Sequence, residues 1–428
     1  MVKNLGEAEE RILGEVYSSS EPLENLEVLC DEFGGRLAGS RENRLAAEFI
    51  LGKYEEYGFE DPHIESFAFP GCEVGSSRLE IIEPVGKKVS CLTLPRTASG
   101  GVEAEVVHLK DVESFEEQKN QVDGKVILVT GRELIRPSAE AGAVGVILMH
   151  PFPRMGPPTG AVAPLVPSVS VSFEDGSMIS RFIKRRGRVR VRVEAEARHF
   201  DRESWNVCGE IRGNDDAEEF VMLGGHYDGH EIAQAAFDCG APCMAALEMG
   251  RVLGRVKERM KRSVRVVLFS AEEFGMWGSK DYAKRHADEM KDMRFTYQLD
   301  CCAGGGTQVV TTDYWPQLEP FFEKLRDDLN INMPILQSMG PGDSRAFFDL
   351  GIPTGSIRDS RPADLPPQLA LLTTVRHTIY DTLDKIHLRS LREVVAIGAV
   401  SGFRMVNAEE WPRHRTPEEI RELLARRA

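Results

Sequence analysis

The sequence contains no apolar run that approaches the roughly 18 residues needed to cross a membrane. Its first 22 residues are acidic and helical in pattern, without the apolar segment of a signal peptide, so we expect neither an anchor nor a leader. Only eight cysteines occur in 428 residues, at irregular spacings. Free thiols in a reducing compartment fit this usage better than a disulfide framework, and the expected location is cytoplasmic.

Positive charge is also scarce, because 53 Lys and Arg residues face 68 Asp and Glu residues and the net charge is −15. This balance argues against a nucleic-acid partner. The most basic run, residues 181–190, is interleaved with Phe, Ile and Val. We interpret it as the solvated face of a pair of strands.

A chain of this length exceeds one hydrophobic core, which predicts two domains or one domain with an insertion. Residues 5–60 have helical periodicity, interrupted by the glycine-containing stretch 34–40. Short alternating runs with turn residues between them follow over about residues 70–197, which predicts a β-rich module. From Trp205 onward the pattern is that of an α/β domain.

Three continuous apolar segments in this part predict buried strands at residues 219–225, 264–271 and 295–300. Helical patterns lie between them, so we expect a sheet covered by helices on both faces. Ligands of such sheets gather at the carboxyl ends of the strands. Each predicted strand ends at a residue able to bind metal, and these are His226, the Glu272–Glu273 pair and Asp300.

Asp238 lies twelve residues after His226, and His377 occurs in a later loop. Two histidines and three carboxylates suit zinc but are too few for two separate closed sites, so a shared carboxylate between two metals would fit them best. Each residue also has a structural interpretation. His226 alone is typical of a hydrogen-bonded structural histidine, and the two glutamates are typical of a helix N-terminus.

The motifs HYD, an aspartate in a loop containing Gly and Ala, EEFGMWGS, LD and HTIYDTLDKI occur in this order. Together they resemble the co-catalytic zinc exopeptidases of the aminopeptidase Y and glutamate carboxypeptidase family, over about residues 36–397. Residues 123–176 resemble the protease-associated domain that many of these enzymes carry. The resemblance implies an α/β fold with a mixed sheet sandwiched by helices, a discontinuous peptidase domain (1–69 and 198–428) and an inserted β-rich domain (70–197).

The resemblance also implies a cofactor of two zinc ions, with other divalent metals left open. His226 and Asp300 would bind one ion, Glu273 and His377 the other, and Asp238 would bridge them. Glu272 would be the general base, and Asp228 would accept the imidazole N–H of His226.

Two positions depart from the family pattern. Cys239 follows the bridging aspartate, where the family usually has Asp or Asn, often across a cis peptide. Arg376 precedes His377, where the family commonly has Tyr, and it would bind either an oxyanion or a substrate carboxylate. We interpret His230 as a loop residue and His387 as a competitor of His377. Asp343 is expected to cap the following helix or to support the site.

We therefore expect a two-zinc exopeptidase that hydrolyses terminal peptide bonds, as an aminopeptidase. A carboxypeptidase or dipeptidase of the same family is the alternative, because Arg376 would suit a free carboxylate. A catalytically silent binding protein and a single-zinc glutaminyl cyclase are less favoured. The expected partner is a peptide substrate, with no nucleic acid and no membrane, and an oligomer is left open.

Overall fold

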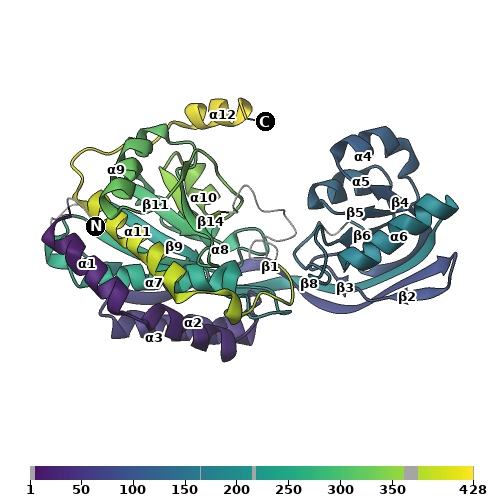
Figure 1. The fold of residues 1–428 in the computed structure, drawn as a ribbon, viewed down its shortest axis with the longest axis horizontal. Coiled ribbons are helices and arrows are strands. Elements are labelled where there is room, and N and C mark those ends of the chain that lie inside the picture. The colour runs from purple at the N-terminus through teal and green to yellow at the C-terminus, as the bar shows by residue number, and fades with distance from the viewer. Residues whose placement is uncertain (1–4, 164, 215–217, 361–374, 428) are drawn as a thin grey trace. The chain divides into compact units, whose positions relative to one another are not determined.

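The computed structural model describes residues 5–163, 165–214, 218–360 and 375–427. The chain divides into two compact units (Figure 1). The first unit contains Met1–Phe69, Glu203–Leu365 and Asp381–Ala428. The second unit contains Pro70–Arg202 and Pro366–Tyr380. Among the described residues, the division differs from the predicted domains mainly in placing 375–380 in the second unit. No helix among the described residues is long and apolar enough to span a membrane.

The first unit is built on a mixed sheet with the strand order β13-β12-β14-β11-β9-β10-β8. Its strands are β8 (Arg190–Ile211, whose end belongs to this unit), β9 (Phe220–His226), β10 (Ser263–Phe269), β11 (Met293–Leu299), β12 (Thr307–Thr311), β13 (Ile335–Leu336) and β14 (Thr354–Ser360). The four strands β14, β11, β9 and β10 run parallel. All seven residues of β9 are buried, as a continuous apolar run predicts for a strand covered on both faces.

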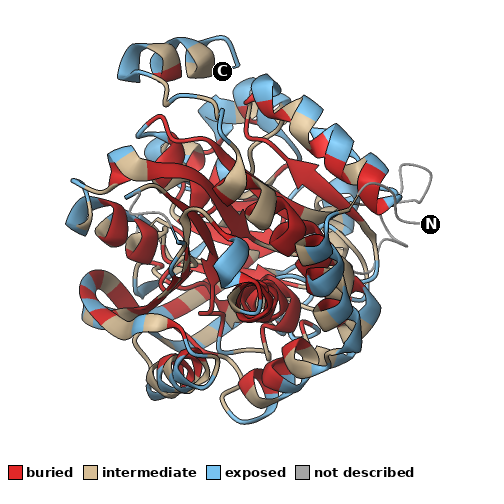
Figure 2. Ribbon diagram, turned by 90° about the vertical axis from the view of Figure 1, so that its left-hand side faces the viewer, coloured by how far each residue is buried: buried red, intermediate tan, exposed pale blue. Residues whose placement is uncertain are grey.

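Helices cover both faces of this sheet. Their bounds are α1 (Glu7–Ser18), α2 (Glu21–Asp31), α3 (Arg41–Glu56), α7 (Ala241–Gly254), α8 (Trp277–Arg285), α9 (Glu319–Leu329), α10 (Ser344–Phe348), α11 (Leu388–Asn407) and α12 (Pro417–Ala425). Helices α7 and α11 pack on β9, while α1 and α2 pack in turn on them. Phe220 and Met222 point to the other face, where they join a core with Tyr282 of α8 and Phe347 of α10. Figure 2 shows the buried strands and the exposed outer sides of these helices.

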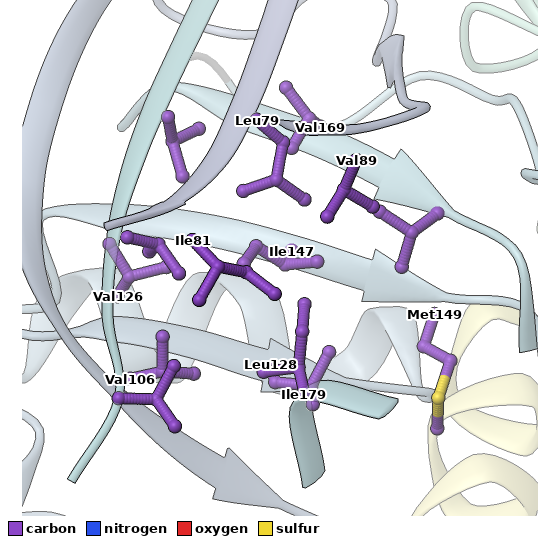
Figure 3. Close-up of a cluster of buried hydrophobic side chains, with 14 of the residues drawn as sticks. Leu79, Ile81, Val89, Val106, Val126, Leu128, Ile147, Met149, Val169 and Ile179 are labelled. Carbon is purple, nitrogen blue, oxygen red and sulfur yellow. The ribbon is translucent and has the colours of Figure 1, made fainter. Parts of the chain in front are cut away.

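The second unit contains its own sheet, in the order β8-β4-β5-β6-β7-β3, with β4 to β7 parallel. Its elements are β1 (Glu60–Glu83, from Pro70 on), β2 (Lys87–Val89), β3 (Leu92–Thr93), β4 (Gly100–Leu109), α4 (Val112–Gln118), β5 (Val126–Val129), α5 (Ile135–Glu140), β6 (Gly145–Met149), β7 (Ser168–Val171) and α6 (Phe173–Arg186). Side chains alternate between two cores. Val126 and Leu128 face Ile179 of α6 (Figure 3), whereas Ile127 packs with Phe115 of α4.

The structure corrects one interpretation of the sequence. Residues 181–186 form the end of helix α6 rather than one face of a strand pair. Lys184, Arg185 and Arg186 lie in its last turn, where cations favour the negative end of the helix dipole. Gly187 ends the helix with a φ of 73°, a conformation that glycine adopts without strain.

The buried guanidinium of Arg36 connects the N-terminal helices to the loop that follows β9. Arg36 is fully buried, and its nitrogens donate to the carbonyl oxygens of Tyr227, Gln234 and Ala235 at 2.8, 2.8 and 3.0 Å. Further bonds reach the carbonyls of Leu29 and Gly34. One side chain therefore satisfies five carbonyl groups in the part of the chain that carries His226 and Asp238.

Replacing Arg36 by Met is expected to destabilise the first unit, because each buried carbonyl left without a donor costs about 1–3 kcal/mol. We expect the free energy of unfolding to fall by about 3 kcal/mol or more. Urea unfolding followed by tryptophan fluorescence measures this, since all four tryptophans belong to the first unit.

Arg11→Met is the matched control, because Arg11 forms an exposed ion pair with Glu258. Its loss is expected to change the unfolding free energy by less than about 1 kcal/mol. Equal destabilisation by the two substitutions would contradict the role given to Arg36.

Candidate metal centre

Three parallel strands deliver metal-binding side chains to one edge of the sheet. His226 is the last residue of β9, and Asp300 directly follows β11. Glu272 and Glu273 come three and four residues after the end of β10. Because these strands run parallel, their carboxyl ends meet at the same edge.

Asp238 reaches the same place from the segment Ala236–Gly240, just before α7. Its Oδ1 lies 3.3 Å from Nε2 of His226, and its side chain is buried. The two oxygens of Asp381 accept the backbone N–H groups of Phe237 and Asp238 at 2.7 and 3.0 Å. A second buried carboxylate thus fixes the backbone on which Asp238 sits, and the Asp238–Cys239 peptide is cis.

Asp228 is fully buried and holds two other parts of the centre. Its oxygens accept the backbone N–H groups of Glu272 and Glu273 at 3.2 and 3.4 Å. Nδ1 of His226 lies 3.5 Å from its Oδ1 and 3.2 Å from its backbone oxygen. Asp228 therefore couples the loop after β10 to the ring of His226 and leaves Nε2 directed at Asp238.

The donor atoms fit a metal ion in spacing and chemistry. The donors of His226, Cys239 and Asp300 lie within 4.8 Å of one another, as do those of Asp238, Asp300 and Cys301. Oδ1 of Asp300 is buried and has no hydrogen-bond partner among the described residues. A buried carboxylate oxygen without a partner is costly unless a cation is nearby. The imidazole and carboxylate donors are of the kind that zinc binds.

The pKa values reflect the crowding of negative charge. Burial, followed by the charges of Glu273, Asp343 and Asp300, raises the pKa of Glu272 well above its usual range. Burial also raises the pKa of Asp343 to about 7 and that of Asp381 to about 7. Without a cation, the ionised forms of these carboxyl groups are therefore less stable than those of exposed carboxyl groups.

His230 adds a donor that the sequence analysis had interpreted as a loop residue. Its Nε2 lies 3.0 Å from Oε2 of Glu273, and both side chains are buried. Its position four residues after His226 carries no helical or strand periodicity. The only available signal was a second histidine in the short loop after a strand end.

Asp343 was expected to cap a helix or to support the site. It precedes α10, but its side chain makes no capping hydrogen bond. It is buried, its Oδ1 has no hydrogen-bond partner among the described residues, and its pKa responds to the charges of His226 and Asp300. These observations favour the supporting role.

His377 and Arg376 belong to the second unit. The carbonyl of His377 accepts the N–H of Thr159, and its φ is 58°. The side chain of Arg376 is exposed. The metal-binding role of His377 and the substrate-binding role of Arg376 stay predictions. His387, the alternative to His377 as a metal ligand, directly precedes α11, and its backbone N–H donates to the carbonyl of Ala303.

Replacing Asp228 by Asn is expected to weaken metal binding about 10–100-fold. The substitution keeps the metal ligand His226 but removes the carboxylate that orients it. The amide can accept from one backbone N–H but has no charge to hold the imidazole. Competition with a chromophoric chelator measures the affinity. Asp327→Asn, in an exposed pair with Arg326, is the control and should leave it unchanged. An unchanged affinity in Asp228→Asn would refute the orienting role.

Comparisons with known proteins agree with this architecture. Residues 206–400 match the model of peptidase family M28, and residues 96–179 match that of the PA domain. The chain is 26% identical to carboxypeptidase Q of Mus musculus over 415 residues, covering 90% of this chain and 86% of that protein. It is 25% identical to a probable leucine aminopeptidase 2 of Aspergillus oryzae over 374 residues, or 81% and 73% of the two chains.

Solved structures share the fold. A peptidase M28 precursor from Shewanella amazonensis superposes with a TM-score of 0.82 at 23% identity, over 95% of this chain and 97% of that one. The zinc aminopeptidase BSAP from Bacillus subtilis gives a TM-score of 0.70 at 19% identity, over 89% and 93%. Residues 206–400 are thus identified as a peptidase M28 domain and residues 96–179 as a PA domain, and the chain is a metallo-exopeptidase.

Proposed function

We propose that this metallo-exopeptidase uses two zinc ions and removes residues from the amino terminus of peptides. The observation that carries the proposal is the meeting of His226, Asp238 and Asp300 at one edge of the sheet, with Glu273 anchored beside them through Asp228. The carboxylate of Asp238 has two oxygens, of which Oδ1 faces His226. In this proposal the other oxygen would bridge to a second ion.

In this proposal His226 and Asp300 bind the first ion, and Glu273 and His377 bind the second. Oε2 of Glu273 already has an imidazole partner in His230, at 3.0 Å. We propose that His230 either joins the second ion as a further donor or fixes the rotamer of Glu273. A ligand set that includes His230 would be richer in nitrogen than the sequence alone suggested.

Zinc held by these residues would lower the pKa of a bound water molecule and would polarise the scissile carbonyl. Glu272 is placed to act as the general base, because its backbone is fixed by Asp228 and its side chain is not one of the proposed ligands. The raised pKa of Glu272 suits a group that takes a proton from water and returns it to the leaving amine.

Charge supports an amino-terminal substrate. Seven carboxylates gather in and around the centre, those of Asp228, Asp238, Glu272, Glu273, Asp300, Asp343 and Asp381. Two zinc ions supply four positive charges and Arg36 supplies one, so an excess of negative charge remains. Such a site attracts the α-ammonium group of a peptide and repels its terminal carboxylate.

Substituting the two neighbouring glutamates should separate catalysis from metal binding. Glu272→Gln is expected to keep its zinc content and to lower turnover by about 10²–10⁴-fold, as loss of a general base does. Glu273→Gln is expected to lose the second zinc. Elemental analysis and steady-state kinetics on both variants provide the measurement. Equal zinc loss in the two variants would show that their roles are exchanged.

A panel of blocked dipeptides tests which chain end is recognised. An aminopeptidase hydrolyses a dipeptide amide with a free amino group and leaves an N-acetyl dipeptide intact, while a carboxypeptidase does the reverse.

If Arg376 stabilises an oxyanion, Arg376→Ala lowers kcat for every substrate. If it binds a carboxylate, the variant raises KM only for substrates with a free carboxyl terminus. Unchanged constants would remove Arg376 from the mechanism.

The carboxypeptidase alternative is favoured by one observation, the similarity to carboxypeptidase Q over 90% of the chain. The same panel decides it.

We also retain the proposal of a cytoplasmic location, which the eight free cysteines support because most of them are buried thiols without a disulfide partner. Cell fractionation tests that proposal directly.

A further inference from the structure

A second group of potential metal ligands lies in the first unit, away from the residues of the metal centre. His63 and Glu65 are on β1, Cys208 is on β8, and His286 directly follows α8. We call these four residues the His63 cluster. None of them belongs to the ligand set proposed above. Positions 63 and 65 share one face of their strand, because side chains alternate along it.

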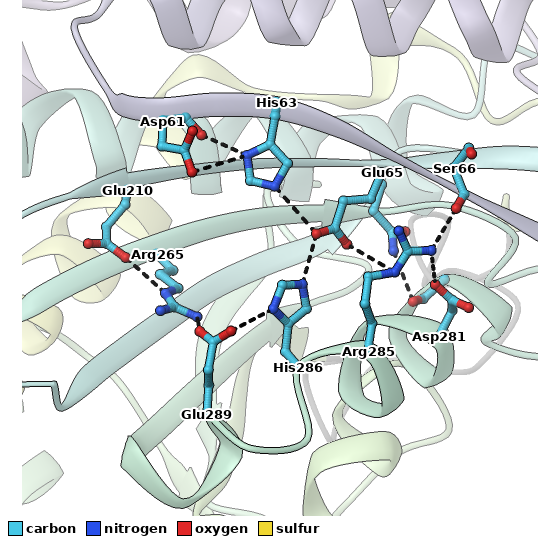
Figure 4. A network of polar contacts seen from close by, with 12 residues as sticks. Asp61, His63, Glu65, Ser66, Glu210, Arg265, Asp281, Arg285, His286 and Glu289 are labelled. Carbon is cyan, nitrogen blue, oxygen red and sulfur yellow. Dashed lines mark hydrogen bonds and ion pairs between the residues drawn. The ribbon is translucent and has the colours of Figure 1, made fainter.

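Both histidines point their Nε2 atoms at one oxygen of Glu65 (Figure 4). The distances to Oε1 are 3.3 Å from His63 and 2.8 Å from His286. The donor atoms of His63, Glu65 and Cys208 lie within 4.8 Å of one another. Donors around a tetrahedral zinc are about 3.3–3.8 Å apart, given bonds of about 2.0–2.3 Å. Small side-chain movements would therefore place an ion where the imidazoles now meet the carboxylate.

The far side of each imidazole is held as in a metal site. Nδ1 of His63 lies 2.7 Å from the backbone oxygen of Asp61, and Nδ1 of His286 lies 2.9 Å from Oε1 of Glu289. An acceptor at Nδ1 keeps a proton there, so Nε2 is the nitrogen that binds a metal ion once the proton it shares with Glu65 is displaced. Both rings are thus oriented with Nε2 toward the same point.

The surroundings favour a cation. Glu65 and Cys208 are 8% and 5% exposed, and Oε2 of Glu65 is buried, with the guanidinium of Arg285 at 3.9 Å as its ion-pair partner. Hydrogen bonds to Glu65 raise the pKa of both histidines, so that without metal their protons balance the negative charge of the network. An ion that displaces these protons would meet five carboxylates and three guanidinium groups, the charged residues being Asp61, Glu65, Glu210, Asp281, Glu289, Arg212, Arg265 and Arg285. A cavity of about 330 Å³, lined by His63, Cys208 and His286, gives an ion a way in.

We propose that His63, Glu65, Cys208 and His286 form a second metal site that binds one zinc ion with four protein ligands. Two nitrogens, one oxygen and one sulfur are donors that zinc accepts in tetrahedral geometry. Four protein ligands leave no position for substrate, so the site is structural. It joins β1 and β8 to the end of α8, the helix that begins soon after Glu273.

The competing interpretation is an ion-pair network in which protonated histidines neutralise Glu65 without any metal. It gives no role to the thiol of Cys208, and it predicts the same metal content with and without that thiol. The two interpretations therefore differ in one requirement, because only the metal site needs a bond to Sγ of Cys208.

The test compares metal content in three forms of the full chain. Elemental analysis after dialysis against zinc should find one equivalent fewer in Cys208→Ser than in wild type. Cys239→Ser is the matched control, because this buried thiol lies beside His226 in the peptidase centre and is not part of the His63 cluster. It should retain the cluster's zinc. This difference does not depend on how many ions the peptidase centre holds, so it is independent of the proposed function.

Cobalt gives a second readout. Protein reloaded with cobalt should show the near-ultraviolet absorption of a cobalt–thiolate bond, retained in Cys239→Ser and lost in Cys208→Ser. If Cys208→Ser fails to fold, His286→Gln decides, because glutamine can still bond to Glu65 while removing a ligand, and it should also lose one zinc. Equal zinc in wild type and both variants, or an absorption that depends on Cys239 alone, would overturn the proposal.

Discussion

The crowding of carboxylates at one edge of the first sheet is the constraint on which the centre depends. Parallel strands bring His226, Glu272, Glu273 and Asp300 to that edge, and the loop before α7 adds Asp238. Burial then removes the water that would screen these charges, which is why the pKa values of Glu272 and Asp343 are raised. Cations offset this repulsion. The same crowding of carboxylates that is unfavourable without metal is the chemistry that suits divalent cations.

Rigid backbone holds these charges in place. Asp228 and Asp381 each accept two backbone N–H groups next to a proposed ligand or base, and the guanidinium of Arg36 satisfies the carbonyls of the intervening loop. Each of these three residues uses a charged group to bind backbone, and charge-assisted hydrogen bonds are stronger than neutral ones. The proposed metal ligands can therefore repel one another without destabilising the loops that carry them.

Much of this could be predicted from the sequence, because it follows from periodicity. Continuous apolar runs located β9, β10 and β11, and the residues that follow them gave the order of the candidate ligands. What could not be predicted depends on contacts between distant segments. His230 lies in an irregular loop, and the His63 cluster brings together residues 63, 65, 208 and 286, whose spacing carries no pattern. The end of helix α6 was missed because its apolar residues Phe182 and Ile183 were interpreted as part of the basic run 181–190.

Cys239 shows how a departure from the family pattern can be accommodated. Burial raises the pKa of its thiol well above the usual range, so the group is neutral, and Sγ donates to the carbonyl of Leu299 at 3.3 Å. An aspartate at this position would add another negative charge to a centre that already has seven carboxylates. A neutral thiol reduces that repulsion while still lying within 4.8 Å of the donor atoms of His226 and Asp300. The substitution therefore changes the charge beside the first proposed metal position and leaves its ligands unaltered. It follows that Cys239 affects the strength of the electrostatic field felt by the substrate more than the ability of the centre to bind metal.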